Sequence, residues 1–234
     1  CFEAKTWSKC ISETIIFTKI FRQKDKKFQK ILDEIRKGEI SDETYEILKL
    51  RNIKPSKKEI KPSVLYSRNI RVDCINNAEL KKLETDKMYQ YNAKIKFSPK
   101  INPKTQRIIK LTEYTKKSTK DFLLKTDKDL ILCKGCQVML NVNLNPELGL
   151  INGSRGIIMD FMENLPIVKF MNGAIQTIDR HSIDFEYDNF TVTKSYIPLQ
   201  LAWALTIHKS QGATLDYVVT NLSRREIFCH GQAY

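Results

Sequence analysis

The sequence lacks several features that mark whole classes of protein. It contains no Gly-Lys dipeptide, so the phosphate-binding loop G-x-x-x-x-G-K-[ST] is absent. No acidic pair is recognisable as a magnesium site. No run approaches the roughly 20 apolar residues that span a bilayer, and no charged-then-apolar secretory signal opens the chain. We therefore expect neither a membrane partner nor a complete nucleotide site.

Histidine is scarce, with three residues, and the six cysteines do not form a convincing metal site. Cys133 and Cys136 have metal-ligand spacing, but zinc normally takes four ligands, and Cys229 with His230 lies far along the chain. We expect no zinc and no thioredoxin-like redox pair. Free thiols in a lysine-rich chain predict an intracellular protein, without distinguishing nucleus, mitochondrion or viral replication site. Because the chain starts at Cys1 rather than at methionine, we expect a longer polypeptide.

Positive charge is abundant: 40 Lys and Arg against 27 Asp and Glu give a net charge of +13. This excess predicts a polyanionic partner, because each neutralised phosphate releases condensed counterions. Charge alone does not separate DNA, RNA and an acidic membrane. The 234 residues, 41% of them hydrophobic, suffice for one domain with an insertion or for two small domains.

The first part of the chain has an alternating α/β texture. We predict strands at residues 14–17 and 63–66, and helices at 28–35, 41–48 and 72–78. Gly38 is a plausible end of the first helix and Ser41 a cap for the second. Strands that alternate with helices indicate a parallel sheet.

Residues 94–129 are lysine-rich and have no sustained helical period, so we predict a basic connection with a few short strands. Its alternative is a solvated linker that contacts no ligand. From residue 130 the sequence is β-rich, with close turn signals that favour a small barrel. The predicted strands are at residues 137–140, 156–159, 167–170 and 175–178. A helix from Pro198 through Leu205 and a strand at 217–219 then return to the α/β pattern.

The strongest chemical signal is residues 201–216, where an apolar run precedes a polar loop. Lys209 offers a positive charge to a phosphate, and His208 and Ser210 offer directional donors. Gly212 allows close approach of the backbone. An ordinary polar loop is the alternative.

This run resembles motif V of superfamily 1B helicases, most closely the Pif-one family, with the RecD-type helicases as relatives. Further resemblances follow in the family's order. They are residues 1–7 after motif III, 20–23 as motif IV, 65–76 as the next strand–helix element, 135–140 and 150–156 as the entry to an SH3-like insertion, and 231–234 approaching motif VI. The resemblance covers nearly the whole chain apart from the basic connection.

The resemblance implies roles for several side chains. Arg22 is similar to the motif IV arginine that reaches the γ-phosphate of ATP across a cleft between two RecA-like domains, where it would be catalytic. Its alternative is a surface salt bridge. Gln23, Gln211 and Gly212 are implied to face the nucleotide. The implied DNA contacts are Asn69, Asn152, Arg155, Thr206, His208, Lys209 and Ser210.

Some of these residues have alternative roles. Asn152 and Arg155 lie in the expected hairpin of the insertion, and for Arg155 a plain turn with an exposed arginine is the alternative. Tyr196 and Trp203 are aromatic candidates for base stacking. For Trp203, a core position on an apolar face is favoured.

The resemblance implies an α/β fold, a RecA-like parallel sheet flanked by helices and interrupted by a small SH3-like β-barrel insertion. The expected domains are a second RecA-like domain in two parts, 1–93 and 196–234, a basic connection at 94–129 and the insertion at 130–195. The implied function is an ATP-dependent 5′-to-3′ DNA helicase with Mg²⁺ bound in a first RecA-like domain. This chain alone is expected to be inactive and monomeric. The implied partners are single-stranded and fork DNA and the first RecA-like domain of the same polypeptide. The alternatives are a stand-alone single-stranded nucleic-acid-binding module and an RNA helicase.

Overall fold

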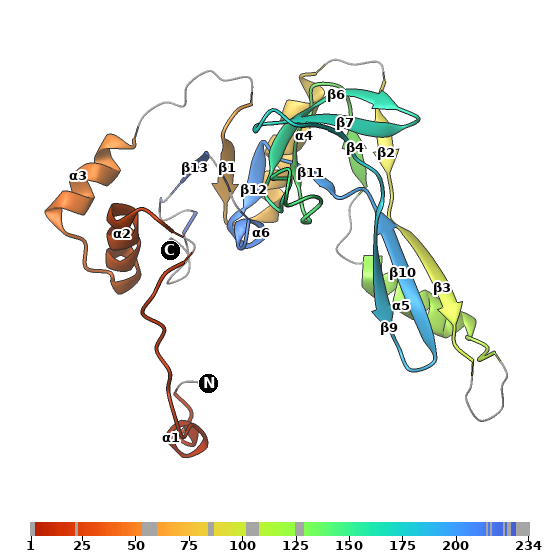
Figure 1. Cartoon of the computed structure of the whole chain (residues 1–234), viewed down its shortest axis with the longest axis horizontal. Helices are drawn as coiled ribbons and strands as arrows, with labels where there is room; N and C mark the ends of the chain where they lie inside the picture. Colours follow the sequence, from red (N-terminus) through yellow and green to blue (C-terminus); the bar gives the residue numbers. More distant parts are fainter. Residues whose placement is uncertain are drawn as a thin grey trace. The chain divides into compact units, whose positions relative to one another are not determined.

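The computed structural model describes residues 3–21, 23–52, 60–83, 87–101, 108–124, 129–213, 215, 217–221, 223 and 226–227. The chain divides into two compact units (Figure 1). The first unit comprises Cys1–Lys54 with Phe228–Tyr234, and the second comprises Pro55–Ile227. Within the described residues, no helix is long and apolar enough to cross a membrane.

The described residues of the first unit form α1 (Trp7–Cys10), α2 (Lys26–Lys37) and α3 (Asp42–Leu50). Asp25 caps α2, its side chain accepting from the N–H groups of Lys27 and Phe28, and Gly38 ends the helix at φ 78°. Ser41 caps α3 by accepting from the N–H of Thr44. Both longer helices and their caps are confirmed.

The strand expected at residues 14–17 is not observed. Residues 11–20 are assigned to no helix or strand, and Ile16 and Phe17 are 79% and 93% exposed. The apolar run suited a buried strand, but burial requires a pairing partner, and the described part of the chain supplies none.

The second unit contains the expected parallel sheet, in the order β12 (Ala204–Thr206), β1 (Ser63–Tyr66), β13 (Val218–Thr220). Helix α4 (Asn69–Lys81) follows β1 directly. The buried Asn76 side chain joins α4 to β12, accepting from the N–H of Ala204 at 2.9 Å and donating to its carbonyl at 3.0 Å. The α/β class is therefore confirmed.

An antiparallel sheet of five strands forms the β-rich part. Its order is β11 (Leu199–Leu201), β5 (Gln137–Leu140), β6 (Arg155–Met162), β7 (Leu165–Phe170) and β8 (Ile175–Thr177). The four strands predicted between residues 137 and 178 correspond to β5, β6, β7 and β8, and β8 ends one residue earlier than predicted. The helix expected from Pro198 through Leu205 is wrong: this segment forms β11 and β12, and only Ile207–Ser210 (α6) is helical. The segment is extended because β11 pairs with β5 and β12 pairs with β1. Residues 202–205 between and within these strands are buried.

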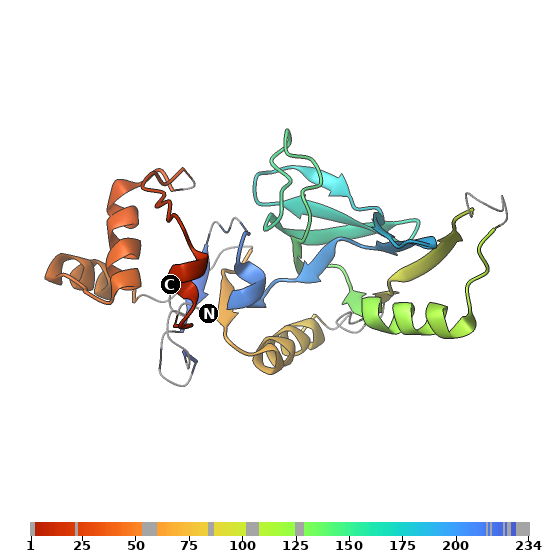
Figure 2. The same ribbon diagram turned by 90° about the horizontal axis from the view of Figure 1, so that it is seen from below.

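A third sheet combines β3 (Lys94–Pro99), β10 (Phe190–Tyr196) and β9 (His181–Glu186). Helix α5 (Glu113–Leu124) lies beside it, as Figure 2 shows, with Leu123 packed in one cluster with Phe190 and Val192. The basic region at 94–129 is thus more ordered than expected, since it contains a strand and a helix. Strands β2 (Tyr89–Tyr91) and β4 (Leu130–Leu132) form a further antiparallel pair.

Candidate nucleic-acid interface

A groove of about 990 Å³ opens in the second unit, next to the ends of β1 and β12. Three of the predicted DNA-contacting residues line it: Asn69 at the start of α4, and Thr206 and Lys209 around α6. Polar side chains beyond the carboxyl ends of parallel strands are the usual ligand-binding arrangement of α/β sheets. The structure therefore brings together residues that are 137 and 140 positions apart (206 − 69 and 209 − 69).

Motif V is shaped by a side-chain cap. Thr206 is 3% exposed, and its hydroxyl accepts from the N–H of Lys209 at 3.3 Å, which starts the single turn of α6. The Ser210 hydroxyl donates to the Ile207 carbonyl at 2.8 Å. His208 and Lys209 are exposed. Thr206 and Ser210 thus set the turn, while His208 and Lys209 are the side chains available to a ligand.

The residues expected near a nucleotide lie in both units. Gln211 and Gly212 are exposed directly after α6, and Gly212 has φ 81°, a conformation that favours glycine. Gln23 is half-buried in the first unit, where its carbonyl accepts from the Gln29 amide. Arg22 lies outside the described residues.

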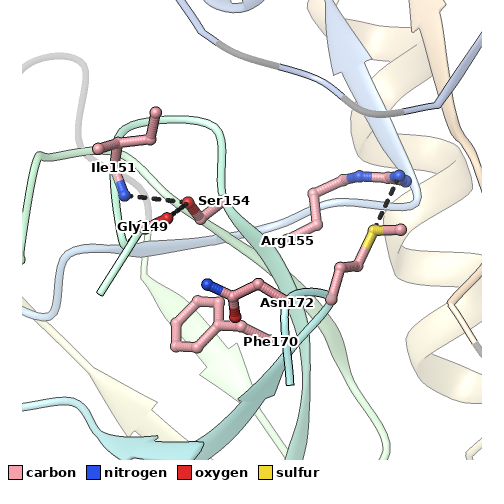
Figure 3. Close-up of a pocket in the computed structure, with 7 residues that line it drawn as sticks. Gly149, Ile151, Ser154, Arg155, Phe170 and Asn172 are labelled. Carbon is pink, nitrogen blue, oxygen red and sulfur yellow. Dashed lines mark hydrogen bonds between the residues drawn. The ribbon is translucent and has the colours of Figure 1, made fainter. Parts of the chain in front are cut away.

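Arg155 differs from its prediction as a phosphate contact on a hairpin. Its side chain is 1% exposed, with Nη1 donating to the Lys61 carbonyl at 3.0 Å and Nη2 lying 3.1 Å from the Met171 sulfur (Figure 3). A small cavity of about 220 Å³ adjoins it. Through these contacts the guanidinium stabilises the fold. Asn152, in the turn before β6, is half-buried, and its N–H donates to Asn143.

The groove has a second wall that the sequence pattern indicated only through Tyr196. Strands β9 and β10 contribute Ile183, Phe185, Lys194 and Tyr196 to its lining. These residues precede Thr206 by at least ten positions, and the fold brings them to the same groove (206 − 196). Trp203, the other aromatic candidate, is 7% exposed and belongs to the core, as favoured.

The Cys133–Cys136 pair is buried in the turn before β5. The two sulfurs lie 3.4 Å apart, and burial raises the pKa of the Cys136 thiol, although the hydrogen bond from the Cys133 N–H acts in the opposite direction. No group of three or more metal-ligating side chains occurs among the residues that the structure describes.

Comparison with known proteins finds Pif1 helicases both by sequence and by structure. A family model described as "DNA helicase Pif1, 2B domain" matches residues 124–161. The ATP-dependent DNA helicase PIF1 of Xenopus laevis is 34% identical over 239 residues, covering 100% of this chain and 35% of the relative. The chain thus spans about a third of the length of this curated relative.

Solved structures show the same relationship. The Pif1 helicase from Candida albicans is similar with a TM-score of 0.65 and 29% identity, covering 100% of this chain and 56% of that one. The Pif1 helicase from Bacteroides in complex with ADP-AlF3 and ssDNA is similar with a TM-score of 0.53 and 28% identity, covering 93% of this chain and 47% of that one.

The parallel sheet, the antiparallel sheet and the motif V loop therefore have the arrangement found in Pif1 helicase structures. Over its whole length the chain is similar to Pif1 helicases, as the order of its motifs predicted.

Proposed function

We propose that this chain is the DNA-gripping part of an ATP-dependent DNA helicase that moves 5′ to 3′ on single-stranded DNA. The observation that carries the proposal is the groove, which gathers Asn69, Thr206 and Lys209 beside a half-buried aromatic side chain, Tyr196. The lysine supplies charge for a phosphate, the Asn69 amide is a directional polar group, and Thr206 sets the turn that carries Lys209. The net charge of +13 favours the same partner.

The similar proteins support this reading. The Xenopus relative is named an ATP-dependent DNA helicase, and the Bacteroides structure is titled as a complex with ssDNA. Fork DNA is a proposed substrate too, since another similar structure concerns unwinding at forked dsDNA by two coordinating Pif1 helicases. We propose that the chain acts within a monomeric, intracellular polypeptide.

ATP and Mg²⁺ are proposed cofactors, and ATP would supply the free energy for domain closure. Within this chain, Gln211 and Gly212 are exposed and fit a nucleotide-facing loop, because a glycine at φ 81° lets backbone N–H groups approach an anion. Arg22 and Gln23 are proposed to face the same nucleotide, Arg22 stabilising charge on the transferred phosphoryl group. The phosphate loop and the magnesium ligands are proposed to lie in a first RecA-like domain.

The first experiment is fluorescence anisotropy of the chain with single-stranded and duplex DNA at two salt concentrations. We expect a preference for single strands, strong weakening by salt, and loss of affinity in the double variant His208→Ala with Ser210→Ala. Arg22→Ala is the matched comparison and should bind DNA normally, because its proposed ligand is the nucleotide. Equal binding to both DNAs, unaffected by the motif V variant, would overturn the proposal.

Two further measurements separate the competing functions. Ribose and deoxyribose strands of one sequence distinguish an RNA helicase from a DNA helicase, since a 2′-hydroxyl changes the contacts. Strand displacement by the full-length protein on substrates with a 5′ or a 3′ tail tests direction. Binding without ATP-dependent displacement on either substrate would favour the stand-alone binding module.

A further inference from the structure

The groove has two chemically different walls. Asn69 and Lys209 stand on the polar wall, which comes from α4 and α6. The other wall comes from the β9–β10 hairpin and presents Ile183, Phe185 and Tyr196, together with Lys194. A single nucleic-acid strand also has a polar and an apolar side, because its phosphates are charged and its bases offer apolar π-faces.

The apolar wall follows from strand alternation. Val192, Lys194 and Tyr196 alternate along β10 and therefore share one face of the three-stranded sheet. At Val192 this face is covered, since Val192 is fully buried in a cluster with Leu123 of α5. The Lys194 ammonium donates to the Leu123 carbonyl at 3.0 Å, in the last turn of α5. Beyond that point the same face opens into the groove.

Tyr196 is held in place before any ligand arrives. Its ring lies edge-on to His181 on the paired strand, with 6.0 Å between the ring centroids and 86° between the planes. The Lys194 ammonium is 5.8 Å from the centroid of the Tyr196 ring. The side chain is only half-buried. A restrained aromatic ring loses little further conformational freedom when a base stacks on it.

We propose that Tyr196 is the base-stacking residue of this groove and gives it selectivity for single strands. The strand binds with its phosphates toward Asn69 and Lys209 and with a base against the Tyr196 ring. Duplex DNA cannot offer that contact, because its base faces are already stacked within the helix. This inference rests on the proposed function and adds the residue that discriminates between the two forms of DNA.

The test compares a natural oligodeoxynucleotide with an abasic one of equal length, which keeps the phosphates and lacks the bases. Anisotropy is measured for the wild-type chain, Tyr196→Ala and Tyr196→Phe. Tyr114→Ala is the matched control, because Tyr114 is 81% exposed on α5 and does not line the groove. Circular dichroism melts establish that each variant is folded.

We expect Tyr196→Ala to bind the natural strand about tenfold more weakly, the size of one lost base–aromatic stack. Its affinity for the abasic strand should equal that of the wild type. Tyr196→Phe and Tyr114→Ala should bind both strands normally. The dependence on salt should stay unchanged in Tyr196→Ala, because no phosphate contact is removed.

Failure of this inference differs from failure of the proposed function. If the wild-type chain binds neither strand, the groove does not bind DNA and the proposed function falls with the inference. If the wild type binds both strands and Tyr196→Ala weakens neither, or weakens both equally, DNA binding stands and the stacking role is overturned.

Discussion

The side chain of Gln137 pairs with both backbone groups of Lys61, although 76 positions separate them. Its oxygen accepts from the Lys61 N–H at 2.9 Å, and its nitrogen donates to the Lys61 carbonyl at 2.8 Å. The same nitrogen donates to the carbonyl of Ala202 at 3.0 Å. Gln137 starts β5 and Lys61 leads into β1, so one amide joins the antiparallel sheet to the parallel sheet.

Gln137→Ala should lower the free energy of unfolding by about 1–3 kcal/mol, because it removes three hydrogen bonds, among them the bond that the Lys61 N–H makes. Gln137 is 2% exposed, so water cannot replace the lost amide without rearrangement. Urea denaturation followed by circular dichroism measures the change. Gln176→Ala is the control, since Gln176 is exposed in β8 and should change stability little. Equal denaturation midpoints for the two variants would contradict the role of Gln137 in joining the two sheets.

Arg155→Met should weaken the fold and leave DNA binding unchanged. The substitution keeps most of the side-chain volume and removes the bond to the Lys61 carbonyl, at a cost of about 1–3 kcal/mol. Thermal melts measure the first effect, and anisotropy at a temperature where the variant is folded measures the second. A normal melt with reduced affinity for single strands would instead restore the phosphate contact predicted from the sequence.

Gly156→Ala should destabilise the antiparallel sheet more than Gly173→Ala does. A Cβ at Gly156 would lie 2.6 Å from both the Lys169 carbonyl oxygen and a Val168 methyl carbon, within strands that are paired on both sides. Such overpacking costs up to about 3 kcal/mol. Gly173 has open space around it, and only its φ of 87° opposes alanine, at about 1 kcal/mol. A lower denaturation midpoint for Gly173→Ala than for Gly156→Ala would contradict the close packing around Gly156.

Cys136 should resist alkylation while Cys74, which is exposed, reacts. The thiolate is the reactive form, and burial raises the pKa of the Cys136 thiol above its ordinary value of about 8.5. Mass spectrometry after iodoacetamide treatment at pH 8 reports each site separately. Because the folded-state pKa is raised, the associated stability is present below about pH 8.5 and is lost as pH rises above it. Equal labelling of both thiols would mean that the turn opens readily.

Local signals predicted α2, α3 and α4, whereas α5 in the basic region was missed and the helix expected from Pro198 through Leu205 is instead β11 and β12. The caps at Ser41 and Gly38 are encoded within a few residues, so α2 and α3 were predictable. Residues 201–205 are apolar throughout, and a run buried on both sides has no period that separates strand from helix. Only pairing with β5 and β1, more than 60 residues away (201 − 138), makes it β11 and β12.

The same limit applies to the candidate site. Motif V was identifiable because its chemistry is contiguous in sequence, whereas the groove depends on how separate elements pack. Lys194 and Phe185 carry no local signal of function, and the pairing of β10 with β3 across the basic region was not foreseen. Arg155 was misjudged because a sequence does not reveal whether an arginine after a turn faces water or the carbonyl of Lys61.

Lys209→Ala provides the most direct test of the polar wall. If Lys209 neutralises one phosphate, its removal should weaken binding to all single strands alike and reduce the slope of log K against log salt by about 1. Lys134→Ala is the matched control, because Lys134 is exposed in the turn before β5 and does not line the groove. The control removes the same charge from the chain, so a general electrostatic effect would lower both slopes equally. A reduced slope in Lys209→Ala alone would place a phosphate beside α6. This result would be independent of the base stacking tested at Tyr196. Equal slopes in the two variants would mean that affinity comes from diffuse positive charge.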